Sequence, residues 1–202
     1  LAALRAAGPA RARMVAVVPP DAPEAKRRAM AAAGVVGARA NLVQGVPLSP
    51  AEVAPLAERI AALGWHLQVF ATADALAALG PVLRAAPCEV VFDHFAGLPL
   101  RGWSAHPAWA VVSGLLREGR GWVKLSSPYS LDQADPLAVR ELARALVALA
   151  PGRLVWGSNW PHPNATTIPD DAALLDALAE WAPEAAVRRA ILVEIPARLY
   201  RF

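Results

Sequence analysis

Short apolar runs alternate with longer amphipathic stretches along the whole chain. Six of these runs are strand candidates, and several of them are rich in Val and apolar on consecutive positions, as strands covered on both faces are. The predicted strands span residues 14–18, 36–43, 66–70, 89–94, 122–126 and 154–158. The alternation predicts an α/β fold in which a parallel sheet lies inside a layer of helices.

The helical stretches have recognisable ends. Ser49 and Glu52 form a capping box, which predicts the start of one helix. A second helix is predicted to begin after Asp135 and a third after Asp170, and a last one covers residues 184–192. The second helix carries an apolar stripe at helical spacing, formed by Leu142, Leu146 and Leu149.

Composition narrows the class of protein. The 202 residues are 56% hydrophobic and 18% charged, which excludes a disordered chain. No run approaches the roughly 18 apolar residues of a membrane span, and the first residues lack the apolar core of a signal peptide. Cys88 is the single cysteine, so a disulfide framework is excluded. We therefore expect one cytoplasmic domain over residues 1–202.

The net charge of +3 raises the question of nucleic acid binding. The arginines are scattered, however, and the densest basic runs, residues 26–28 and 188–189, fall in helical patterns typical of solvated faces. We expect neither a nucleic acid nor a membrane partner.

Polar residues at the carboxyl ends of the strands are the candidates for chemistry, because sites of α/β sheets and barrels gather there. Asp93 and His94 end the fourth strand, either as a general acid, base or hydrogen-bond donor or as a pair that pins the next loop. Arg39 lies in an otherwise apolar strand and needs an anionic partner, either an acidic side chain or a substrate carboxylate.

The loop over residues 156–164 is the most informative segment. Its two Trp and two Pro predict a rigid loop that presents Asn159, His162 and Asn164, with a capped structural loop as the alternative. His66, at a strand start, is expected to be a hydrogen-bonded core histidine. The chain has no G-x-S-x-G, P-loop or dinucleotide motif, and no two histidines at ligand spacing, so covalent catalysis, nucleotide binding and a three-histidine zinc site lose support.

Five segments together resemble a known family in order and spacing: residues 36–42, 64–68, 91–94, 122–126 and 156–164. The chain resembles the amidohydrolase superfamily, and within it the branch of 2-pyrone-4,6-dicarboxylate lactonases and related barrel hydrolases. The resemblance implies an incomplete (β/α)₈ TIM barrel that carries strands three to eight and lacks the first two β/α units. It therefore implies an N-terminally truncated chain, in which either the ends of the barrel re-close or a partner covers the open edges, for example by self-association.

The resemblance also implies roles for particular residues. His94 matches a histidine that helps to polarise the lactone carbonyl, and Asn159 stands where the family has an aspartate that activates the attacking water. An amide oxygen is far too weakly basic to take that proton. Four residues are expected to bind the substrate: Arg39 through a carboxylate, Asn164, His162 and Tyr129.

The chain departs from the family pattern at further positions. Phe70 replaces a tyrosine, Ser130 an arginine, and Gly45 stands where another carboxylate-binding arginine is found. The lactonases of this branch work without a metal, whereas other amidohydrolases bind zinc through ligands of which this chain has no complete set. We expect no metal and no cofactor.

These expectations lead to a hydrolase that acts on a small carboxylated lactone or related carbonyl compound by direct water attack, with catalysis weakened by Asn159. Two alternatives stay open: a catalytically silent barrel remnant that binds a carboxylate ligand or a partner chain, and a metal-dependent decarboxylase or hydrolase of the same superfamily.

Overall fold

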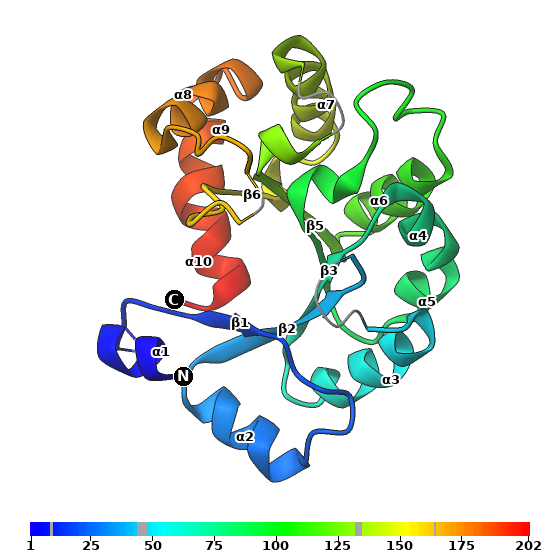
Figure 1. Cartoon of the computed structure of the whole chain (residues 1–202), viewed down its shortest axis with the longest axis vertical. Helices are drawn as coiled ribbons and strands as arrows, with labels where there is room; N and C mark the ends of the chain where they lie inside the picture. The colour runs from blue at the N-terminus through cyan, green and yellow to red at the C-terminus, as the bar shows by residue number, and fades with distance from the viewer. Residues whose placement is uncertain (9, 44–47, 132–134, 164) are drawn as a thin grey trace.

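The computed structural model describes residues 1–8, 10–43, 48–131, 135–163 and 165–202. In it, six parallel strands pair in the order of the chain to form a curled sheet, and the helices lie around its outer face (Figure 1). The strands are β1 (Met14–Ala16), β2 (Val35–Asn41), β3 (His66–Phe70), β4 (Val90–Phe92), β5 (Gly121–Ser126) and β6 (Leu154–Gly157). All six strands predicted from the apolar runs are present.

The helices follow the strands in the expected alternation. The α-helices are α1 (Ala2–Ala7), α2 (Glu24–Ala32), α3 (Pro50–Ala61), α4 (Ala73–Ala78), α5 (Gly80–Ala85), α6 (Pro107–Arg117), α7 (Pro136–Leu149), α8 (Asp171–Trp181), α9 (Ala185–Arg189) and α10 (Ile195–Tyr200). The shorter helical segments are η1 (His94–Gly97), η2 (Pro128–Ser130), η4 (Pro151–Arg153) and the π-helical η5 (Ala190–Glu194). The capping box of α3 and the caps Asp135 and Asp170 are confirmed.

Several boundaries differ from the prediction: the strands predicted over residues 14–18, 36–43 and 154–158 end at Ala16, Asn41 and Gly157, and two further differences have a clear physical cause. The helix predicted over residues 184–192 extends through α9, η5 and α10 to Tyr200, because a π-helical stretch carries the chain past the expected end. The strand predicted to include His94 ends at Phe92, because residues 94–96 adopt a left-handed backbone conformation that no strand accommodates.

The two faces of the sheet differ in chemistry. On β2, Ala38 and Ala40 are fully buried beneath the outer helices, and Arg39 lies on the opposite, inner face, since successive side chains of a strand alternate. The register pairs Arg39 with Gln68 of β3, so polar groups of neighbouring strands lie side by side inside the curl. Among the described residues, no helix is long and apolar enough to cross a membrane.

Candidate active site

Asp93 is the buried centre of a charged cluster on the inner face. It directly follows β4, is 3% exposed, and is reached by side chains from three other strands. Arg39 Nε donates to its Oδ2 at 2.7 Å, Gln68 Nε2 donates to the same oxygen at 3.0 Å, and Lys124 Nζ lies 3.2 Å from Oδ1. Burial works against the carboxylate, but the positive charges of Lys124 and Arg39 outweigh it and lower the pKa of Asp93. Asp93 is therefore a fixed anion that holds two cations.

Arg39 is held at one edge of its guanidinium and open at the other. Its Nε is bound to Asp93, while no residue in the described part of the chain accepts a hydrogen bond from its two Nη groups. The side chain is 28% exposed, and its Cζ lies 4.7 Å from the centre of the Phe70 ring. A guanidinium fixed in this way offers its remaining edge to a carboxylate in a two-point geometry.

His94 lies at the carboxyl end of β4, with a φ of 49°. Its Nδ1 is 2.9 Å from Oγ of Ser126, and its ring meets Phe70 edge-on, with the ring centres 5.2 Å apart. Burial is the largest influence and lowers the pKa of His94, which the charge of Asp93 opposes only in part. The result is a neutral, oriented imidazole at the border of a cavity of about 430 Å³.

Asn159 lies in the loop after β6, with a φ of 67°. Its Nδ2 donates to Oγ of Ser127 at 3.2 Å and to the hydroxyl of Tyr129 at 2.9 Å. No described residue is hydrogen-bonded to its Oδ1. The side-chain amide is thus fixed through its nitrogen and keeps its oxygen for another donor.

Tyr129 and His162 extend this contact into a chain of polar groups. The Tyr129 hydroxyl is 2.9 Å from His162 Nδ1, and His162 Nε2 is 3.1 Å from Oδ1 of Asp171 at the start of α8. His162 is 4% exposed. The structure therefore places His162 behind Tyr129 rather than on the open rim that the rigid-loop interpretation expected, and its direct contact with a substrate stays a prediction.

The contacts of His94 and those of Asn159 meet at the end of β5. His94 is bound to Ser126, and Asn159 is bound to the next residue, Ser127, whose φ of 53° turns the chain there. His94 and Asn159 therefore lie at the same rim of the curled sheet, which is the condition on which the hydrolase interpretation depends. Asn164 and Gly45 lie outside the described residues.

A catalytic metal does not fit the donors that the described residues supply. Position 159 carries a neutral amide, and no three His, Cys, Asp or Glu side chains in the described ranges come together to hold a metal ion. We derive no step through a metal.

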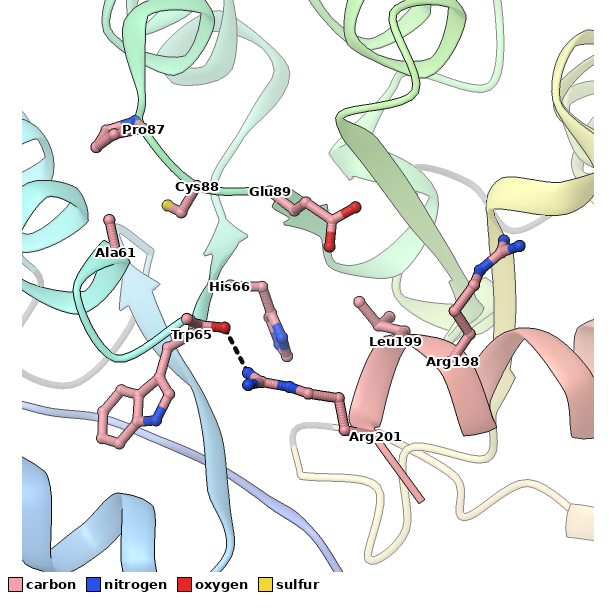
Figure 2. A pocket seen from close by; sticks show the side chains of 10 residues that line it. Ala61, Trp65, His66, Pro87, Cys88, Glu89, Arg198, Leu199 and Arg201 are labelled. Atoms are coloured by element: carbon pink, nitrogen blue, oxygen red, sulfur yellow. Dashed lines mark hydrogen bonds between the residues drawn. The ribbon is translucent and has the colours of Figure 1, made fainter.

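A second cavity, of about 270 Å³, lies at the opposite end of the strands (Figure 2). His66 and Trp65 line it from the start of β3, and Arg201 reaches it from the C-terminal segment and donates to the carbonyl of Gly64. His66 is buried as expected, but the described residues offer no hydrogen-bond partner to its Nε2, because that atom faces the backbone of Gly37. The expectation of a hydrogen-bonded histidine is therefore wrong for this atom.

Three residues of the site received no role from the sequence. Lys124 and Gln68 stand at inward positions of apolar strands, and this pattern signals a buried anion nearby without saying which one. Asp171 was recognised only as negative charge at a helix start, because its contact with His162 joins two segments that no local pattern relates.

Comparison with known proteins gives a consistent result. The model of the amidohydrolase family matches residues 1–202. The chain is 34% identical over 204 residues to a 2-pyrone-4,6-dicarboxylate hydrolase of Comamonas testosteroni, and 32% identical over 199 residues to a D-galactarolactone isomerase of Agrobacterium fabrum. Each match covers 94% of this chain and 67% of the relative, so the chain spans about two thirds of their length.

Solved structures share the fold. The crystal structure of a protein from Pseudomonas putida, described as a putative 2-pyrone-4,6-dicarboxylic acid hydrolase, superposes on this chain with a TM-score of 0.86. The two chains are 29% identical, and the match covers 99% of this chain and 75% of that one. The six curled strands are thus the matching part of a TIM barrel, as the resemblance implied. The chain belongs to the amidohydrolase family of hydrolases, of whose barrel it carries six strands.

Proposed function

We propose that the protein hydrolyses a small carboxylated lactone by direct attack of water on the lactone carbonyl. The observation that carries the proposal is that Arg39 and His94 both pack against the ring of Phe70. The guanidinium packs 4.7 Å from the Phe70 ring centre, and the imidazole packs 5.2 Å from it. A carboxylate and a carbonyl of one small molecule can therefore be held at the same time.

Arg39 binds the substrate in this proposal. Its open Nη edge grips a carboxylate, while Asp93 keeps the other edge in place. The carboxylate group of the substrate supplies the anionic partner that the exposed part of this cation lacks. Tight orientation of the lactone ring is the main contribution expected from this contact.

His94 stabilises the charge that develops on the carbonyl oxygen. In the tautomer that carries its proton on Nε2, Nδ1 accepts from the Ser126 hydroxyl and Nε2 donates to that carbonyl oxygen. A donor that is aimed and neutral before the reaction needs no reorganisation as negative charge builds up. Asn159 holds the attacking water through its free Oδ1.

Two lactones named for the relatives serve as probes: 2-pyrone-4,6-dicarboxylate and D-galactarolactone. We expect the purified chain to open at least one of them, measured as acid release at constant pH. Arg39→Lys retains the charge beside Asp93 but loses the two-point edge, so we expect KM to rise about tenfold or more with kcat little changed. His94→Gln is expected to lower kcat instead.

Arg101→Lys, on an exposed loop, is the control for the Arg39 variant. Hydrolysis of neither lactone by the native chain, together with thermal stabilisation by both, would replace the proposal with the silent carboxylate binder. Equal KM values for the native chain and Arg39→Lys would remove Arg39 from the substrate site.

A further inference from the structure

The proposed hydrolysis needs a group that accepts a proton from water, and the amide at position 159 is not one. The group next to that amide is the phenol of Tyr129, 2.9 Å from Asn159 Nδ2. A water held by Asn159 Oδ1 on the side of that hydroxyl would lie within reach of Tyr129. The inference below rests on the proposed function, because it concerns the source of the base for that reaction.

Tyr129 is the first member of a series of polar groups, in which its hydroxyl is hydrogen-bonded to His162 and His162 contacts Asp171. The next member, His162, has one ring nitrogen 2.9 Å from the phenol oxygen and the other 3.1 Å from the carboxylate of Asp171. The carboxylate of Asp171 lies 3.1 Å from Nε2 without the alignment of a hydrogen bond, and its negative charge favours the tautomer of the neutral ring that carries its proton on Nε2. Nδ1 is then an acceptor, and the Tyr129 hydroxyl must donate to it.

The surroundings hold this series rigidly. The side chain of His162 is 1% exposed, its ring meets that of Tyr129 edge-on at 5.7 Å, and a φ of 57° sets its position in the loop. Asp171 lies in the first turn of the 11-residue helix α8, where the helix dipole favours a negative charge. The buried imidazole of His162 lies between the phenol of Tyr129 and the carboxylate of Asp171. This arrangement suits proton transfer from the phenol to the imidazole.

We propose that Tyr129, His162 and Asp171 form a proton relay that takes the place of the missing carboxylate at position 159. As the water oxygen forms its bond to the lactone carbonyl carbon, a water O–H bond breaks and the proton moves to the Tyr129 oxygen. The Tyr129 proton moves to His162 Nδ1, and Asp171 stabilises the imidazolium. The proton returns along the same path to the leaving ring oxygen, which leaves the relay unchanged.

The test compares the relay in two backgrounds. Tyr129→Phe and His162→Gln are each expected to lower kcat about 10²- to 10⁴-fold in the native chain, the range of a lost general base. In an Asn159→Asp background the carboxylate takes the proton directly, so the same changes are expected to lower kcat less than tenfold. Losses of the same size in both backgrounds would mean that these residues only shape the site, and would overturn the relay.

A second measurement does not depend on turnover. Nitrogen NMR of the histidine-labelled native chain is expected to show His162 with its proton on Nε2, and Asp171→Asn is expected to disturb that signal. A proton on Nδ1 would overturn the relay, because the phenol could then not donate. Asp176→Asn, an exposed position on the same helix, is the control for Asp171→Asn.

The two measurements separate the two proposals. If the native chain opens neither lactone, the proposed function fails, and the NMR result alone decides whether the relay is assembled. If the native chain is active but the losses do not depend on the background, the function stands and the relay fails. Circular dichroism at the assay temperature confirms that each variant is folded.

Discussion

At the scale of single residues, His66 is a buried titratable group whose pKa lies far below its ordinary value. It is 3% exposed, and its Nε2 faces Gly37 so closely that a Cβ there would come within 2.4 Å. Burial is the main cause that lowers the pKa of His66 to about 4, and the charges of Lys124 and Arg201 add to it while that of Asp93 opposes it. The folded protein keeps this ring neutral where an unfolded chain would protonate it.

We therefore expect the free energy of unfolding to fall as the pH drops from about 6.5 to about 4, since only the unfolded state binds the proton in that window. The shift corresponds to a loss of about 3 kcal/mol from His66. The lowered pKa of Asp93 acts at lower pH, because its contribution is complete above about 3.9.

Urea unfolding followed by circular dichroism between pH 4 and 7.5 measures this slope. His66→Gln is expected to be less stable at pH 7 and to show a flatter dependence on pH, whereas His106→Gln, at the start of α6, is expected to retain the native slope. A His66→Gln profile parallel to that of the native chain would exclude His66 as the source.

At the scale of the elements, apolar runs located the six strands, and caps located the starts of α3, α7 and α8. Leu142 and Leu146 of the predicted stripe on α7 are fully buried, and Asp135 caps that helix as its sequence indicates. The contacts of Asp93 could not be derived in this way, because the register between strands decides which inward side chains meet. The position of His162 could not be predicted either, because a left-handed backbone conformation is uncommon at residues other than glycine and the sequence signals it only weakly.

Two leucines of α7 test how far burial determines the stability of the helix. Leu146 is fully buried, whereas Leu137 is 63% exposed on the same helix. Leu146→Ala is expected to lower the free energy of unfolding by about 2 to 5 kcal/mol, the cost of a cavity left in a packed core. Leu137→Ala makes the same chemical change and is expected to have little effect in urea unfolding. Similar losses for the two variants would mean that α7 does not pack as described.

At the scale of the whole molecule, the two edges of the curled sheet are tied at the amino end of the strands. The helix α10 packs on β6, and the segment after it reaches the other edge (Figure 1). Arg13, just before β1, donates to the carbonyl of Arg201 at 3.1 and 2.7 Å and lies over the ring of Phe202. The Arg201 guanidinium donates in turn to the carbonyls of Val36 and Gly64.

Arg201→Ala tests whether this tie maintains the curl of the sheet. Loss of its hydrogen bonds is expected to lower the free energy of unfolding by about 1 to 2 kcal/mol. A looser tie also leaves the backbone groups of β1 and β6 more open to pairing, so sedimentation velocity should show more self-association as the concentration rises. Arg101→Ala removes the same charge from an exposed loop and serves as the control in both measurements. Matching stability and sedimentation for the two variants would show that the curl is set by the strands and helices alone, since twist and helix packing would then suffice without the C-terminal contact.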